Sequence, residues 1–210
     1  MGQDKLWVDV GGRPLIDLTL QLLAAVFEPR PRGFVVVAPG QRWERLRHLA
    51  AAAGIRDLAL IEGGERRQDS VRAALQLLPS DADIVCVHDA ARPLCPAPVF
   101  AAVLEAAERC GAATAAVRLV DSVKRIDDDA MVVETLDRSR LVAVQTPQAF
   151  ARDVLLEAHA RAVEDGFAAD DDCALVERIE HPVAVVPGDP ANIKITVATD
   201  LRLLGVLSSP

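Results

Sequence analysis

The chain has 210 residues, of which 51% are hydrophobic and only 3% aromatic, and it carries a formal net charge of −8. The length predicts one domain over residues 1–210, and the aliphatic, aromatic-poor composition favours the α/β class. The acidic balance argues against a surface for nucleic acid or anionic membrane, which requires clustered Lys and Arg. No apolar run has the roughly 18 residues of a membrane span, and no signal peptide is recognisable, so we expect a cytoplasmic protein without a membrane partner.

Apolar runs alternate with segments of helical periodicity along the chain, which is the pattern of β-α-β units. We expect strands over residues 34–37, 58–61, 84–87, 112–117 and 183–186. We expect helices over residues 14–26, 41–53, 69–78, 96–109 and 151–164, with a last helix from Thr199. The alternation predicts a mostly parallel central sheet with helices on both faces.

The pattern changes over about residues 119–145, where the sequence becomes polar and alternating around the turn "DDDA". Residues 120–126 and 131–135 are predicted to form a β-hairpin arm that leaves the main sheet. An isolated hairpin cannot bury both of its faces, so we expect the arm to pack on a second subunit in a homodimer.

Charged side chains follow the predicted strand over residues 84–87, in the segment "VHDAARP". Ligands bind outside the carboxyl ends of parallel strands, and a carboxylate there can hold Mg²⁺ together with nucleotide phosphates. Asp89 and Arg92 are therefore candidate site residues. The alternative is that Asp89 only caps a helix or pairs with Arg92.

Other candidates lie in segments whose residues also have a purely structural interpretation. Gly63, Gly64 and Ser70 lie in "EGGERRQDSVRAAL", a strand–turn–helix junction that allows close backbone approach to a ligand but is common in α/β proteins. Lys194 in "GDPANIKIT" is a candidate phosphate contact or a solvent-facing residue of an edge strand, and Lys5 is a candidate cation or a solvated loop lysine.

Taken together and in order, the motifs "GGERRQDSV", "VHDAARP", "DSVKR", "LDRSRLVAVQTPQAF", "DDDCALVE" and "NIKITVATDL" resemble those of the 2-C-methyl-D-erythritol 4-phosphate cytidylyltransferases. The resemblance runs from Met1 almost to the C-terminus. It implies a homodimeric, Rossmann-like nucleotidyltransferase of isoprenoid precursor synthesis. Such an enzyme joins CTP to methylerythritol phosphate and releases pyrophosphate, with Mg²⁺ as cofactor and no covalent enzyme intermediate.

The resemblance also implies roles for individual residues. Lys5 and Lys194 match the catalytic lysines, and Asp89 matches the aspartate that binds metal and nucleotide. Gly63, Gly64 and Ser70 match the cytidine-binding turn. The expected substrate-binding residues are Arg92, Ser122, Arg138, Thr146, Asp170 and Lys194. Of these, Ser122 and Arg138 are expected to reach the sugar phosphate of the opposite subunit. Lysines and arginines suit such a site because phosphoryl transfer is catalysed by cations around the reacting phosphate.

The sequence departs from the family pattern in three places. The family has a strand and the glycine-rich turn "AAGxGxR" ahead of the position of Met1, and neither is in this sequence, so we expect one fewer strand and weaker phosphate binding. Asp170 replaces a threonine and is expected to repel the substrate phosphate. Ser122 replaces a threonine but keeps the hydroxyl. We expect the chain extended upstream of Met1 to be the active form.

Two alternatives stay open at this point. A relative that acts on ribitol 5-phosphate shares most of these motifs. An inactive, N-terminally truncated dimeric remnant that binds nucleotide weakly is the second alternative, and the absent glycine-rich turn and Asp170 favour it.

Overall fold

The computed structural model describes residues 3–27 and 33–207. Its strands are β1 (Asp9–Val10), β2 (Arg13–Pro14), β3 (Phe34–Val37), β4 (Leu58–Ile61), β5 (Ile84–Val87), β6 (Ala112–Arg118), β7 (Val123–Ile126), β8 (Val132–Leu136), β9 (Val142–Ala151) and β10 (Ala184–Pro187). Its α-helices are α1 (Leu15–Val26), α2 (Trp43–Ala52), α3 (Arg67–Leu75), α4 (Ala97–Cys110), α5 (Arg152–Glu164), α6 (Asp172–Arg178) and α7 (Ala198–Leu207). Short 3-10 helices are η1 (Gln3–Trp7), η2 (Gly40–Arg42) and η3 (Arg138–Arg140).

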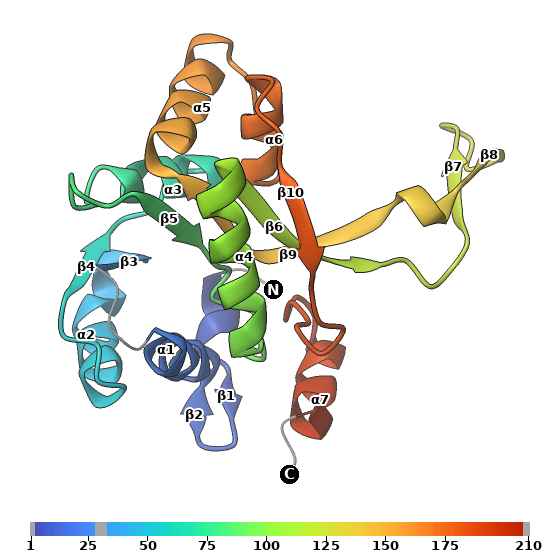
Figure 1. Ribbon diagram of the computed structural model, residues 1–210. Helices are drawn as coiled ribbons and strands as arrows, with labels where there is room; N and C mark the ends of the chain where they lie inside the picture. The colour runs from blue at the N-terminus through green and yellow to red at the C-terminus, as the bar shows by residue number, and fades with distance from the viewer. Residues whose placement is uncertain (1–2, 28–32, 208–210) are drawn as a thin grey trace.

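The predicted α/β class is confirmed, with the strands distributed over more than one sheet. A four-stranded sheet has the order β10-β6-β9-β5, and β3 and β4 form a separate parallel pair. Within the larger sheet β10 and β6 are parallel, whereas β9 runs antiparallel to both β6 and β5. Helices cover both faces, as Figure 1 shows.

Strand β9 was not predicted, because Pro147 interrupts its apolar pattern and proline cannot donate to a sheet ladder. The register with β6 shifts between Thr114 and Ala116, so Pro147 lies where the ladder is already interrupted. The Thr146–Pro147 peptide bond is cis. The shift in register with β6 explains how β9, which lies between β6 and β5, can contain a proline.

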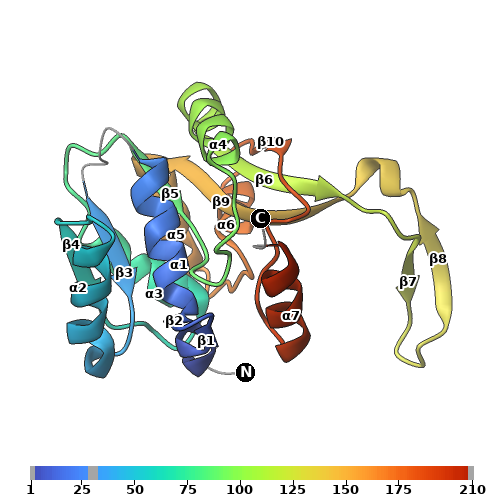
Figure 2. The ribbon, with the colours of Figure 1, turned by 90° about the horizontal axis from the view of Figure 1, so that it is seen from below.

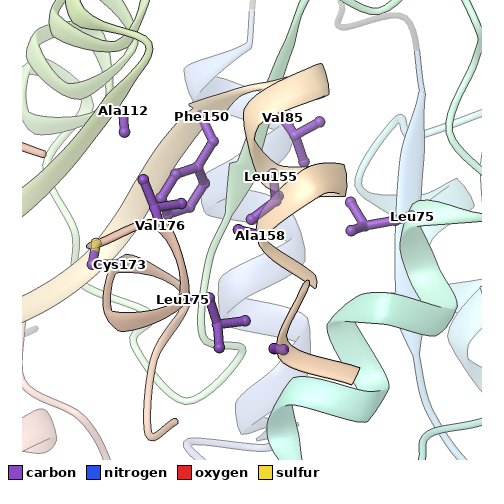
Figure 3. Close-up of a cluster of buried hydrophobic side chains, with 10 residues drawn as sticks. Leu75, Val85, Ala112, Phe150, Leu155, Ala158, Cys173, Leu175 and Val176 are labelled. Carbon is purple, nitrogen blue, oxygen red and sulfur yellow. The ribbon is translucent and has the colours of Figure 1, made fainter. Parts of the chain in front are cut away.

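The core on one face of the sheet lies beneath α3, α5 and α6. The ring of Phe150 on β9 is fully buried among Val85 of β5, Leu155 of α5 and Val176 of α6, as Figure 3 shows. On the other face α4 packs Phe100 and Val103 against β6 and β9. These two layers hold β5 and β9 firmly, and the polar residues at their adjoining ends inherit that rigidity.

Helix α4 is capped at its carboxyl end by Gly111, which has a φ of 80°. A Cβ there would lie 2.6 Å from the ring of His181, so both the backbone conformation and the available space require glycine. The chain can therefore turn directly from α4 into β6.

The predicted arm is present as the antiparallel pair β7–β8, which projects away from the body in Figures 1 and 2. Its turn is stabilised by Asp127, whose Oδ1 accepts hydrogen bonds from the backbone N–H groups of Asp129 and Met131. Met131 and Val132 are 65% and 61% exposed. The arm thus presents apolar side chains that the described part of the body leaves largely exposed.

Candidate active site

Two hydrogen bonds to the hydroxyl of Thr146 fix the end of β5 to β9, and a third contact of the His88 imidazole stays within the segment that follows β5. The Oγ1 of Thr146 accepts from the backbone N–H of Asp89 at 3.0 Å and lies 3.2 Å from Nδ1 of His88. The Nε2 of His88 lies 3.0 Å from the carbonyl of Arg92, which can only accept, so we assign the proton to Nε2 and let Thr146 donate to Nδ1. Burial, partly against the ring of Phe100, lowers the pKa of His88 to about 4.

The loop that carries Lys194 is attached to the same strand ends. The side chain of Asn192 is fully buried and donates to the carbonyl of Thr146 at 2.9 Å, while Arg92 donates from Nη1 to the carbonyl of Asn192 at 2.7 Å. The N–H of Ile195 donates to the carbonyl of Ala91. These contacts bracket Lys194 in sequence and present its amine to Asp89.

The carboxylate of Asp89 is the centre of a cationic cluster. Its Oδ2 lies 2.8 Å from Nζ of Lys194 and 3.8 Å from Nε of Arg92, and its Oδ1 lies 3.4 Å from Nε of Arg67. Burial acts to raise the pKa of Asp89, but the hydrogen bond and charge of Lys194, together with Arg67 and Arg92, outweigh it and lower the pKa. Asp89 is therefore an ionised carboxylate at neutral pH.

Lys5 of η1 belongs to the same electrostatic environment. Burial and the charge of Lys194 lower the pKa of Lys5, whereas Asp89 and Asp200 act to raise it. The cations Lys5, Arg67, Arg92 and Lys194 thus outnumber the carboxylates around them, Asp89, Asp172 and Asp200. A protein of net charge −8 has concentrated positive charge at one place, as binding of a polyanion such as a triphosphate requires.

The cluster offers one carboxylate for a divalent cation. Within residues 3–27 and 33–207, no group of three or more His, Cys, Asp and Glu side chains is arranged to hold a metal ion. Mg²⁺ commonly takes only one or two protein carboxylates and completes its shell with phosphate oxygens and water. Oδ1 of Asp89 lies 3.4 Å from Nε of Arg67, whereas Oδ2 lies only 2.8 Å from Nζ of Lys194, so Oδ1 is the less tightly paired oxygen. A carboxylate oxygen is a hard donor, and Asp89 therefore fits Mg²⁺ brought by a nucleotide.

Comparison with known proteins identifies the family to which the chain belongs. Residues 1–207 match the family model described as IspD, 2-C-methyl-D-erythritol 4-phosphate cytidylyltransferase. The chain belongs to this cytidylyltransferase family. Curated relatives with that name are 51% identical over 148 residues in Symbiobacterium thermophilum and 41% identical over 200 residues in Pelotomaculum thermopropionicum.

Coverage differs among these relatives. The match covers 70% of this chain and 63% of the Symbiobacterium protein, but 95% of this chain and 84% of the Pelotomaculum protein. It covers 98% of this chain and 52% of a bifunctional IspD/IspF enzyme from Desulforudis audaxviator, at 46% identity. The chain thus spans about half to two thirds of the length of two of these three relatives.

Solved structures agree with the assignment. The cytidylyltransferase from Thermus thermophilus superimposes with a TM-score of 0.79 at 34% identity, covering 97% of this chain and 92% of that one. The 4-diphosphocytidyl-2C-methyl-D-erythritol synthase from Anaerococcus prevotii gives a TM-score of 0.87 at 27% identity, covering 94% and 87%. The cytidylyltransferase fold is therefore shared across the whole described body.

The structure brings some of the residues predicted from the family pattern together. Lys5, Asp89, Arg92 and Lys194 form the cluster described above, and the contact between Asp89 and Lys194 shows that loops 105 residues apart in sequence converge at one strand end. Thr146 lies beside them but is buried, and its hydroxyl is engaged by His88 and Asp89. Its observed role is to hold the strand end, and the substrate contact stays a prediction.

Gly63 and Gly64 form an exposed turn between β4 and α3. A Cβ on Gly64 would lie 2.4 Å from Cβ of Asp69, and one on Gly63 would lie 2.9 Å from Oγ of Ser70. The chain folds back closely on the first turn of α3, so both glycines have a structural reason. Ser70 donates to the carbonyl of Arg66, and the predicted nucleotide contacts of all three residues stay predictions.

Three predicted substrate-binding residues do not enter this cluster through any contact that the structure records. Ser122 precedes β7 and Arg138 begins η3, where its guanidinium contacts the carbonyl of Val120. Both are exposed and lie at the arm, and their contact with the substrate of another subunit stays a prediction. Asp170 is exposed just ahead of α6.

Sequence reasoning missed Arg67 and Asp172, which contact each other at 2.7 Å beneath Asp89. Both lie inside motifs that carry the family resemblance, "GGERRQDSV" and "DDDCALVE". Neither motif indicates which of its repeated arginines or aspartates is buried. Their place in these two motifs was the signal that could have pointed to them.

Proposed function

We propose that this protein is a CTP-dependent cytidylyltransferase that joins CTP and 2-C-methyl-D-erythritol 4-phosphate to give 4-diphosphocytidyl-2-C-methyl-D-erythritol and pyrophosphate. The observation that carries the proposal is the convergence of Lys5, Lys194 and Asp89 at the end of β5 in a chain of this family. Family membership favours methylerythritol phosphate over ribitol 5-phosphate as the acceptor.

In the proposed reaction an oxygen of the methylerythritol phosphate attacks the α-phosphorus of CTP. One P–O bond forms while the bond between the α-phosphorus and the bridging oxygen breaks, and pyrophosphate leaves with that oxygen. The acceptor phosphate is already an anion, so no general base is required. The main tasks of the protein are to position the two phosphates and to stabilise the charge that develops between them.

Lys194 and Lys5 are the groups that stabilise this charge. Lys5 is half-buried and close to Lys194, a placement that suits it to contact an incoming phosphate. Lys194 is held by Asp89 until the nucleotide arrives, and Asp89 is the residue that would hold Mg²⁺. When bound, Mg²⁺ neutralises phosphate oxygens and orients the triphosphate.

We also propose that the active protein is a homodimer joined through the β7–β8 arm, in which Ser122 and Arg138 contact the acceptor phosphate of the opposite subunit. Ile126 and Val132 are directly paired across the hairpin, so their side chains share one face, and they are 56% and 61% exposed. A partner subunit would cover this face.

The test is release of pyrophosphate by the protein with CTP and Mg²⁺. Methylerythritol phosphate and ribitol 5-phosphate are compared as acceptors. Release that depends on methylerythritol phosphate is expected. Absence of release, or a higher kcat/KM with ribitol 5-phosphate, contradicts the proposed function.

Titration calorimetry with CTP and Mg²⁺ distinguishes an enzyme from an inactive remnant. The proposed function requires saturable CTP binding that weakens on removal of Mg²⁺ by a chelator. Failure to bind CTP supports the remnant instead.

A further inference from the structure

Beneath the site, a fully buried carboxylate is shared between two elements far apart in sequence. Asp172, the first residue of α6, has no exposed surface, and its Oδ2 accepts from Nη1 of Arg67 at 2.7 Å. Its Oδ1 lies 3.1 Å from Nε2 of His159 on α5, a ring that is 2% exposed. A carboxylate is costly to bury unless both oxygens have partners, and here each oxygen has one.

The direction of the His159 ring follows from its two nitrogens. A carboxylate oxygen accepts, so Nε2 carries the hydrogen, while Nδ1 is buried and has no hydrogen-bond partner among the described residues. The ring therefore has one polar contact, and that contact aims at Asp172. Packing of α5 against α6 fixes the distance between them.

Arg67 connects this buried pair to the reacting centre. Its Nη1 faces Asp172, and its Nε faces Oδ1 of Asp89 at 3.4 Å, so one planar guanidinium spans both carboxylates. Burial acts to lower the pKa of Arg67, but the charges of Asp172 and Asp89 outweigh it and raise the pKa. Arg67 stays charged.

We propose that Arg67, oriented by the buried Asp172–His159 pair, is a positioning residue that holds the carboxylate of Asp89 between itself and Lys194. The proposal rests on the proposed function, in which Asp89 and Lys194 act on the nucleotide. Arg67 draws Oδ1 toward α3 and so limits how completely Asp89 neutralises Lys194. Without Arg67 the carboxylate turns toward Lys194 and keeps its amine from the phosphate.

The neighbouring Arg66 shows that this role depends on placement and not on composition. Arg66 is half-exposed and pairs with Asp69 within the first turn of α3. The next residue along, Arg67, has its guanidinium turned toward Asp172, which is 105 residues away in sequence. One step along the start of the helix thus separates a surface capping contact from a contact with the site.

Steady-state kinetics of the protein test the proposal. Arg67→Gln is expected to lower kcat about tenfold or more, while KM for CTP changes by less than about threefold. Arg67→Lys keeps the charge but not the fork and is expected to recover little of the lost kcat. The matched control is Arg161→Gln, an exposed arginine on α5 two residues from His159, which is expected to leave both constants unchanged.

The variants His159→Gln and His159→Leu test whether the contact between His159 and Asp172 orients Arg67. Glutamine retains a donor for Oδ1 of Asp172, and leucine does not, so the glutamine variant is expected to keep a several-fold higher kcat. Equal kcat values for the two variants contradict the proposal. This pair remains informative even if Arg67→Gln does not fold, because neither replacement leaves Arg67 without its carboxylates.

A double-mutant cycle asks whether Arg67 acts through Asp89. The variant with both Arg67→Gln and Asp89→Asn is expected to have a kcat within about threefold of Asp89→Asn alone, because the residue to be positioned is already lost. Fully multiplicative effects would overturn the proposal, since a purely structural role of Arg67 predicts independence.

A spectroscopic measurement does not require turnover and so separates this inference from the proposed function. The Nε–H resonance of Arg67 is observed by ¹⁵N NMR in the wild-type chain and in the variants Asp172→Asn and Asp89→Asn. We expect both variants to shift it, and Arg161→Gln to leave it in place. An inactive wild-type enzyme with these shifts refutes the proposed function alone, and an active one without them refutes the positioning of Asp89 through Arg67.

Discussion

At the end of β5, polar side chains are buried and held by several partners, whereas on the β7–β8 arm apolar side chains are largely exposed. Thr146, Asn192 and Asp172 are each less than 5% exposed, and all three make hydrogen bonds between distant segments. Ile126, Met131 and Val132 are each more than half exposed. The first region is arranged in advance by one chain, and the second is the surface that the proposed homodimer would cover.

The largest expected effect is a loss of turnover when Lys194, beside Asp89 at the end of β5, is replaced. Lys194→Ala is expected to lower kcat by about 10²–10³-fold, the usual result of removing one group that stabilises developing charge, and to weaken CTP binding less. Arg109→Ala, an exposed arginine paired with Glu105 on α4, is the control. Calorimetry and steady-state rates measure the two effects, and a larger loss in CTP affinity than in kcat would give Lys194 a purely binding role.

A pH-dependent effect on stability should arise at the same strand end. The folded chain binds a proton at His88 only near pH 4, where burial has placed its pKa, whereas the unfolded chain binds one near pH 6.5. Stability is therefore lost as the pH falls from about 6.5 to 4, by about 3 kcal/mol from this residue. The pKa of Asp89 lies below 3.8, so its own contribution is lost at lower pH.

Urea unfolding at pH 7 and pH 4.5 measures this loss in the wild type and in His88→Gln. The variant is expected to have a flatter pH dependence over this window. An unchanged difference between the two pH values would mean that His88 titrates normally in the fold.

A smaller effect is expected when the apolar face of the arm is made charged. The double variant Ile126→Asp with Val132→Asp should raise the dimer dissociation constant by about 10–100-fold, because two carboxylates would be desolvated at the interface. The free energy of unfolding of the body should not change, since neither side chain enters a core cluster. Sedimentation velocity measures the assembly, with Val163→Asp on α5 as an equally exposed control. Dissociation by the control as well, or by neither, would argue against the arm as the interface.

The smallest expected effect concerns Asp170 beside α6. Asp170→Thr should lower KM for methylerythritol phosphate by about two- to fivefold, because an exposed carboxylate near an incoming phosphate contributes a weak, screened repulsion. The effect should shrink as salt is raised. A KM that does not respond to the substitution at low salt would show that the acceptor phosphate binds elsewhere.

Much of the body could be predicted from sequence because its signals are local. The strands of residues 34–37, 58–61 and 84–87 are short apolar runs between turn residues, and the structure has all three with the same bounds. Strand β9 was not predicted because a proline is not expected in a strand with neighbours on both sides. The structure accommodates Pro147 where the register with β6 is interrupted. Asp172 escaped for a different reason: three consecutive aspartates look alike until the packing of α5 and α6 buries one of them.

The candidate site divides in the same way. Asp89 could be predicted because a charged residue directly after a buried strand is unusual on its own, and Lys194 and Lys5 came from the family pattern. The connection of Arg67 to Asp172 and His159 depends on three helices meeting, which no spacing in the sequence encodes.

The position of α7 has a practical consequence for anyone who modifies this protein. Leu204 of α7 is fully buried in one cluster with Leu15 of α1 and Ile195, and Ile195 is the residue directly after Lys194. Helix α7 therefore packs behind the loop that carries Lys194, and its Asp200 also lies in the electrostatic environment of Lys5. Affinity tags, fusions and deletions near the carboxyl end should be judged by whether they disturb the packing of Leu204. Loss of that packing would remove support from Ile195 and so make the position of Lys194 less well defined.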